Sequence, residues 1–211
     1  MAGRSWLAVC LALALSQTAC ANPPTADPCA HDREAMLALD EAAFDQDMTG
    51  GWRVVASVPG CQRVAADLIA DWRRTNPQAG GIVSWHEGQL RAGAGQYPQA
   101  AILMAAARKP PEADKAGWNA YVDASVAFLQ RDRDALLAAR ERLQAVPWLP
   151  TDGMQPPVDG IVAVTFDNGQ SMRMRWPPNI DVVDGLIACF DRPYDEAYGT
   201  DCRPPLPPAK Q

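Results

Sequence analysis

The stretch that decides the fold of this 211-residue chain reads IVSWHEGQLRAGAGQYPQAAILMAAAR, from Ile82 to Arg108. Apolar and small residues recur at helical spacing on both sides of the turn Gly95-Gln96-Tyr97. A short loop between two amphipathic helices makes them antiparallel neighbours. The stretch therefore predicts a helical hairpin in which Ile82–Ala94 packs against Pro98–Arg108.

The flanking sequence continues the helical pattern. Upstream, Asp32 can cap a helix that runs to about Asp47. The next helix carries one continuous apolar stripe, made of Cys61, Val64, Ala65, Leu68, Ile69 and Trp72. Downstream, Lys115–Gln130 and Asp134–Ala145 predict a second hairpin, and Asn179 can cap a final helix. We therefore expect a mainly α-helical fold.

The first hairpin has small and large residues at the signature spacing of a known repeat: Gly88, Gly95, Tyr97, Ala100, Met104 and Ala107. On these residues the chain resembles the tetratricopeptide repeat family. Small residues let the two helices approach closely, and the tyrosine and methionine fill the space beside them. The resemblance implies a short array of antiparallel helix pairs, an α-solenoid, in an exported bacterial protein.

The later segments match this pattern less completely. The second hairpin keeps Ala135 and Pro147, but Asp123 and Asp132 stand where glycine and tyrosine are expected. Near the C-terminus, the spacing of the first hairpin returns in Gly185, Tyr194 and Ala197. The resemblance covers roughly half of the mature chain. Degenerate helical hairpins of no named family are the alternative.

A β-hairpin is predicted near residues 161–176. Two strand-like runs, Ile161–Phe166 and Ser171–Trp176, flank an Asn168-Gly169 pair, which is a strong signal for a two-residue turn. That turn would place Ile161 opposite Trp176. Because a lone hairpin is marginally stable in water, it either packs on the helices or forms a binding edge.

The N-terminus predicts export. A charged start is followed by an apolar run, Trp6–Leu15, that is shorter than the roughly 20 residues a membrane-spanning helix needs. We interpret residues 1–21 as a signal peptide and 22–28 as a proline-rich linker. Cleavage before Asn22 would release a soluble chain into the periplasm. Cleavage before Cys20 would leave a lipid-anchored protein on the bacterial envelope, and both alternatives stay open.

The cysteines predict disulfide bonds. Cys10 is lost with the signal peptide, and four cysteines remain besides Cys20. An even number in an exported chain favours two disulfides, for which three pairings exist. We favour Cys29–Cys61 with Cys189–Cys202, because each pair brackets a helical segment near one end of the chain.

The chain divides into segments of different character. We expect a helical-repeat region over 29–147, and a β-hairpin with disulfide-linked C-terminal helices over 148–202 in the same domain. A disordered tail is expected over 203–211. The formal net charge is −6, and removal of the signal peptide makes it one unit more negative. This acidity argues against a nucleic acid or an anionic membrane as partner and permits a basic protein.

Catalytic motifs are not found in the sequence. There is no G-x-S-x-G motif or P-loop, and His86-Glu87 lacks the second histidine of a zinc-protease helix. Asp45 and Asp47 lie at an expected helix terminus, where capping and solvation explain them. We therefore expect no catalytic residue, no metal, no cofactor and no enzymatic activity.

Two sets of residues are candidates for partner binding. If the repeat resemblance holds, the first helix of each pair lines a concave surface, which would carry Trp85, Gln89 and Trp118, with Tyr121 nearby. Arg173 and Arg175 on the predicted β-hairpin form a second candidate surface. The alternative for the aromatic set is a core position between repeats.

These observations favour a non-catalytic protein-binding module of the cell envelope. It could act as a scaffold or assembly factor, or as an immunity-type inhibitor of a secreted toxin. Two other functions stay open. One is an enzyme acting on envelope polysaccharide through dispersed carboxylates, and the other is a carrier that holds a small ligand between the β-hairpin and the helices.

Overall fold

The computed structural model describes residues 27–149, 155–165 and 170–208, so the predicted signal peptide, Cys20 and Asn168-Gly169 lie outside the described residues. The fold is mainly helical with one two-stranded antiparallel sheet, as the sequence predicted. In chain order the elements are α1 (Arg33–Leu37), η1 (Ala42–Gln46), α2 (Trp52–Ala56), α3 (Gln62–Thr75), α4 (Gly81–Gly93), α5 (Tyr97–Ala106), η2 (Pro111–Ala113), α6 (Trp118–Leu129), α7 (Arg133–Gln144), β1 (Ile161–Thr165), β2 (Ser171–Arg175), α8 (Ile180–Ala188), α9 (Tyr194–Tyr198) and η3 (Thr200–Cys202).

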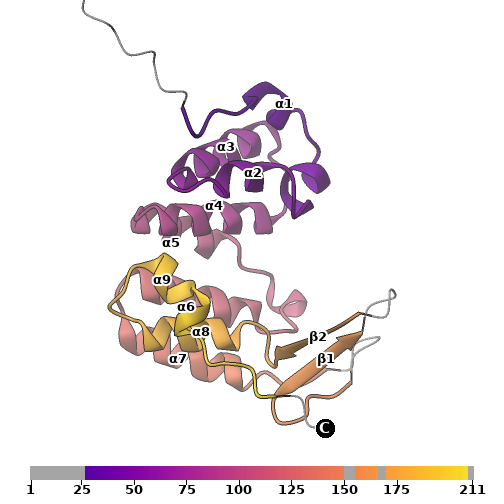
Figure 1. The fold of residues 1–211 in the computed structure, drawn as a ribbon. Helices are drawn as coiled ribbons and strands as arrows, with labels where there is room; N and C mark the ends of the chain where they lie inside the picture. Colours follow the sequence, from indigo (N-terminus) through magenta and orange to yellow (C-terminus); the bar gives the residue numbers. More distant parts are fainter. Residues whose placement is uncertain (1–26, 150–154, 166–169, 209–211) are drawn as a thin grey trace, which may run out of the picture.

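The elements are stacked along one direction (Figure 1). Helices α1, α2 and α3 form one end, α4 and α5 lie in the middle, and α6 to α9 form the other end. The β-hairpin projects sideways from the end that holds α6 to α9. Among the described helices, none is both long enough and apolar enough to cross a membrane.

The N-terminal layer differs from the single helix predicted between Asp32 and Asp47. Asp32 caps α1 as expected, because its carboxylate accepts a hydrogen bond from the backbone N–H of Ala35 at 3.0 Å. The helix ends at Leu37, and the carboxylate of Asp40 then accepts from the N–H of Ala43 at the start of the π-helical turn η1. This second side-chain cap interrupts the helix.

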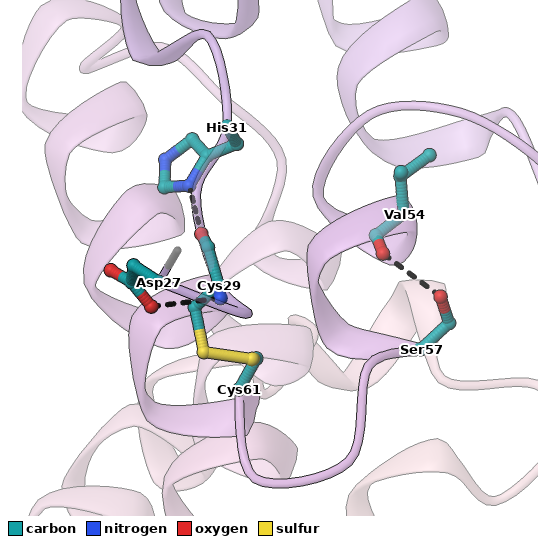
Figure 2. The surroundings of a disulfide bond; sticks show 6 residues. All are labelled: Asp27, Cys29, His31, Val54, Ser57 and Cys61. Carbon is teal, nitrogen blue, oxygen red and sulfur yellow. Dashed lines mark hydrogen bonds between the residues drawn. A yellow bond between two sulfur atoms is a disulfide. The ribbon is translucent and has the colours of Figure 1, made fainter. Parts of the chain in front are cut away.

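A disulfide bond fastens this layer to the chain start. Cys29 and Cys61 are joined as predicted, with their Cα atoms 5.5 Å apart (Figure 2). The carboxylate of Asp27 accepts from the N–H of Cys29 at 2.9 Å, and Nδ1 of His31 lies 2.9 Å from the carbonyl oxygen of Cys29. In the core cluster that contains Cys61, Phe44 and Trp72 stack with ring centroids 4.7 Å apart. The bond therefore fixes the segment around Cys29 against the start of α3.

The predicted helix pairs form, with ends within a few residues of expectation. Helix α4 pairs with α5, and α6 pairs with α7. A Cβ atom added at Gly88 would lie 3.3 Å from the carbonyl oxygen of Ala100, so the two helices touch at these residues. A Cβ atom at Gly185 would lie 3.1 Å from the carbonyl oxygen of Ala197, in the pair α8–α9. The same close approach therefore recurs at both places where the sequence repeats its spacing.

The last pair folds back onto the earlier ones. Helix α8 packs on α6 and α7, while α9 contacts α4. The backbone N–H of Tyr194 donates to the hydroxyl of Tyr97 at 3.1 Å, so the tyrosines of the two matching hairpins meet directly. Cys189 and Cys202 are joined, as predicted, and hold α9 between α8 and η3. The C-terminal pair thus covers the surface formed by α4 and α6.

The register of the β-hairpin differs by one residue from the prediction. Ile161 pairs with Arg175 rather than with Trp176, and Val162 pairs with Met174. Thr165 pairs with Ser171, so five residues, 166–170, connect the paired ends of the strands, whereas a two-residue turn requires an even number. A shift of one residue exchanges the two faces of a strand, and Val162, which is 1% exposed, now lies on a buried face.

The described part of the tail contacts the β-hairpin, and the disorder expected over 203–211 stays a prediction. The guanidinium of Arg173 donates to the carbonyl oxygen of Pro207 at 2.9 Å. The guanidinium of Arg175 donates to the carbonyl oxygen of Pro205 at 2.7 Å. Two arginines on one strand therefore hold the proline-rich segment, which has no secondary structure of its own.

The close approach of α4 and α5 predicts different outcomes for two glycines of the same helix. In Gly88→Val, the Cβ atom would meet Cγ of Met104 at 2.9 Å, and we expect the free energy of unfolding to fall by about 2–3 kcal/mol. Gly93→Val is the control, because a Cβ atom there meets nothing within 4 Å, and we expect a change below about 0.5 kcal/mol. Urea unfolding followed by circular dichroism measures both. Equal losses in the two variants would contradict the packing at Gly88.

Candidate binding site

The residues predicted to line a concave surface lie together but are largely covered. Trp85 is 3% exposed and Tyr121 is 2% exposed, while Trp118 is partly buried against them. The ring centroid of Trp85 lies 4.9 Å from those of both Trp118 and Tyr121. Burial raises the pKa of Tyr121 well above its ordinary value, so its phenol stays neutral. Partner binding stays a prediction for this set, with Gln89 and Trp118 as its partly exposed members.

A groove remains open beside this aromatic cluster, between α2, α4 and α9. Its volume is about 300 Å³. We call it the α4 groove, and its lining residues are Trp52, His86, Gln89, Leu90, Gly93, Tyr194, Asp195 and Tyr198. The α4 members follow the spacing i, i+3, i+4, i+7, which places them along one face of the helix. The groove therefore has a floor from one helix and walls from two segments far apart in the sequence.

A buried hydrogen-bond network fixes one wall of the groove. The carboxylate of Asp45 is 0% exposed and accepts from Nε1 of Trp52 at 2.9 Å. Nδ1 of His86 lies 2.7 Å from the same carboxylate. The guanidinium of Arg53 donates to the backbone carbonyl of Asp45 and lies over the Trp52 ring, 4.2 Å from its centroid. The network joins η1, α2 and α4.

Asp45 stays ionised despite its burial. Desolvation raises the pKa of this carboxyl, but the hydrogen bond and charge of His86, the hydrogen bond from Trp52 and the charge of Arg53 together outweigh it. The pKa of Asp45 therefore lies below its ordinary value. An ionised carboxylate can only accept, so Nδ1 of His86 carries the proton and donates it. This hydrogen bond fixes the orientation of the imidazole ring.

The groove can position a ligand, but its described lining contains no hydroxyl of Ser or Thr, no thiol and no lysine. A carboxylate-held histidine is the arrangement of a general base, and it also serves as a rigid acceptor in a binding site. Asp195 is the carboxylate on the lining. In the described part of the chain, no three His, Cys, Asp or Glu side chains are grouped to hold a metal ion.

Sequence reasoning missed this site. Asp45 was expected to cap or face solvent at a helix terminus, and that is wrong, because its side chain is fully buried. His86 lies 41 residues from Asp45, so no local spacing connects the two. Tyr194 and Tyr198 come from the far end of the chain. The one available signal was the helical spacing of His86, Gln89, Leu90 and Gly93.

The second predicted surface, Arg173 and Arg175, lies away from the α4 groove. Both arginines bind carbonyl oxygens of the chain's own tail. They line two different cavities, with Arg173 beside Ala163 and Pro207, and Arg175 beside Arg140.

No family model, no curated protein and no solved structure matches this chain. The class of protein is therefore defined by its own architecture. It is a disulfide-linked, mainly helical protein of packed hairpins, with an open groove along α4.

The burial of Asp45 predicts a pH-dependent stability. Because its pKa is lower in the folded state than the value of about 3.9 in an unfolded chain, its stabilisation is present above about pH 4 and is lost as the pH falls through the folded pKa. In Asp45→Asn, we expect the free energy of unfolding at pH 7 to fall by about 3 kcal/mol and its dependence on pH below 4 to flatten. Chemical unfolding between pH 2 and 7 measures both effects.

Asp191→Asn is the matched control for this change. Asp191 is exposed, and we expect its replacement to shift the free energy of unfolding by less than about 0.5 kcal/mol. If Asp45→Asn behaved like Asp191→Asn, the network of Asp45, Trp52 and His86 would not stabilise the fold.

Proposed function

We propose that this protein is an exported, non-catalytic protein-binding module of the bacterial envelope, which holds a segment of its partner in the α4 groove. Its role is that of a scaffold or assembly factor, or of an immunity-type inhibitor of a secreted toxin. The observation that carries the proposal is the α4 groove, whose floor lies on one helix and whose walls are each fastened by a buried network or a disulfide.

Export is supported by the disulfides and the N-terminus together. Two disulfides indicate an oxidising compartment, extracellular or periplasmic. The apolar run before Cys20 is typical of a signal peptide. Attachment through a lipid at Cys20 is the finer alternative to a soluble periplasmic protein, and mass spectrometry of the mature N-terminus distinguishes them.

The groove has the size and rigidity of a site for one or two partner side chains. A volume of about 300 Å³ is at the lower end of natural ligand pockets. Trp52 is 8% exposed and Tyr194 is 3% exposed, so their rings are already packed before a partner arrives. Preorganised residues lose little conformational freedom on binding, which favours affinity. His86 would present an imidazole ring, held in place by Asp45, to a polar group of the partner.

Charge favours a basic partner segment. The chain carries a formal net charge of −6, and exposed Asp195 stands at the edge of the groove. Opposite charge accelerates association and suppresses wrong partners more than it raises affinity. The association rate of the true partner would therefore fall as salt is added.

Filling the groove tests the proposal. In Gly93→Trp a large ring is added at a residue that lines the groove, and its Cβ atom meets nothing within 4 Å. We expect this variant to lose, by at least tenfold, the stoichiometric partner that the wild-type protein recovers from an envelope extract. The readout is affinity capture at several salt concentrations, quantified by mass spectrometry.

Ile102→Trp is the matched control, because it adds the same ring at a residue of α5 that is 72% exposed and outside the groove. The control should keep the partner. Equal recovery by both variants would place binding elsewhere, and no stoichiometric partner at any salt concentration would contradict the proposal.

A second candidate function follows from the pair of Asp45 and His86. A histidine oriented by a carboxylate can act as a general base, which favours an enzyme acting on envelope polysaccharide. We rank it second because Asp195 is the sole carboxylate among the described groove-lining residues. Release of reducing ends from purified envelope polysaccharide, abolished in His86→Ala, would support it over the binding module.

A further inference from the structure

A second cavity lies between α7, α8 and the β-hairpin, away from the α4 groove. Its volume is about 290 Å³. We call it the arginine pocket, and its lining residues are Arg140, Gln144, Gly160, Arg175, Trp176, Pro177, Ile180 and Asp184. It differs from the α4 groove in the charged groups that line it, two guanidiniums and one carboxylate.

The positive charge of this pocket is not balanced by its lining. Nε of Arg140 donates to the carboxylate of Asp184 at 2.9 Å, and its other nitrogen donates to Gln144. Arg175 has a weaker set of contacts. Its Nη2 donates to the carbonyl oxygen of Pro205 at 2.7 Å, and its Nε is buried with no hydrogen-bond partner among the described residues. Among the described residues, Arg175 therefore has no ion pair with a carboxylate, although the net charge of the chain is −6.

The pocket is rigid on the side of Arg175. The strand β2 pairs along its length with β1. Next to Arg175, the ring of Trp176 packs edge-on against Trp148, with centroids 4.7 Å apart. Nε1 of Trp176 also donates to the carbonyl oxygen of Val146 at 3.4 Å. Opposite, the side chains of Arg140 and Asp184 are 31% and 28% exposed, so a solute can reach the pocket from this side.

We propose that the arginine pocket binds a singly charged carboxylate. A guanidinium presents its donors in a planar fork that matches the two oxygens of a carboxylate, and a partly desolvated guanidinium without a counterion gains most from such a ligand. The surplus of one positive charge suits a monoanion. A phosphate or sulfate dianion would meet the repulsion of Asp184 in the same cavity. This site is independent of the α4 groove, so either can fail without the other.

The carboxylate could belong to a free small acid or to the C-terminus of a bound peptide. Both present the same two oxygens to Arg175, and they differ in what surrounds the carboxylate. Trp176, Pro177 and Ile180 provide the apolar lining that a peptide side chain would contact and that acetate would not.

Two arginines on the same strand supply the test. Arg173→Met and Arg175→Met each remove one guanidinium and its hydrogen bonds to the tail, which reach Pro207 and Pro208 from Arg173 and Pro205 from Arg175. Only Arg175 lines the arginine pocket. Sodium acetate is titrated into each full-length protein at constant ionic strength, with chloride as the replaced anion, and the indole N–H signal of Trp176 is followed by NMR.

We expect a saturable shift of the Trp176 signal in the wild-type protein. Arg175→Met should weaken acetate binding by at least roughly tenfold, and Arg173→Met should leave it within about twofold. Arg175→Lys keeps the positive charge but loses the planar guanidinium, so we expect its acetate affinity to lie between those of the wild-type protein and Arg175→Met. This variant replaces Arg175→Met in the test if the methionine variant does not fold. The proposal is overturned if acetate gives no saturable shift, if the two methionine variants lose binding equally, or if sulfate binds more tightly than acetate.

A second titration identifies the source of the carboxylate. A tripeptide with a free C-terminus is compared with the same tripeptide amidated at its C-terminus. The site is assigned to a peptide C-terminus if the tripeptide with a free C-terminus binds more tightly than acetate and the amidated tripeptide does not bind. Equal affinity of the free acid and acetate assigns it to a small acid, and binding of the amide as tight as the acid overturns the carboxylate proposal.

Discussion

The rest of the structure depends on the close approach of paired helices at glycine. Where α4 meets α5, Gly88 faces the backbone of Ala100, and where α8 meets α9, Gly185 faces the backbone of Ala197. No side chain larger than hydrogen fits at either place without displacing its neighbour. Because both pairs are drawn together in the same way, their tyrosines take matching positions, and the N–H of Tyr194 reaches the hydroxyl of Tyr97. This contact brings the last helix pair onto the first.

The return of α9 onto α4 decides which surfaces remain for binding. It forms a groove between α2, α4 and α9, while Trp85 is buried against the rings of Trp118 and Tyr121 from α6. The two disulfides fasten the opposite walls of this groove, because Cys29–Cys61 holds the layer of α2 and Cys189–Cys202 holds α9. In an oxidising compartment both walls are fixed before any partner arrives, which lowers the entropic cost of binding.

The β-hairpin takes part in the fold through its arginines more than through an apolar face. Arg173 and Arg175 hold the proline-rich tail by its carbonyl oxygens, which a segment without secondary structure offers in series. Arg175 also closes one side of the arginine pocket. One strand thus orders the C-terminal segment and contributes an unbalanced positive charge beside α7 and α8.

The sequence by itself indicated the helices from α3 to α8, the turns between the paired helices and the favoured disulfide pairing. Each rests on a local pattern, such as the stripe from Cys61 to Trp72 or the turn at Gly95, and local patterns act through neighbours along the chain. The repeated spacing of Gly88 and Gly185 also anticipated where helices touch. Only the tertiary structure decided that Asp45 is buried beside His86, that α9 returns onto α4, and that the β-hairpin shifts by one residue. Those outcomes depend on contacts between residues distant in sequence, where burial of a face or pairing of a charge overrides local preference.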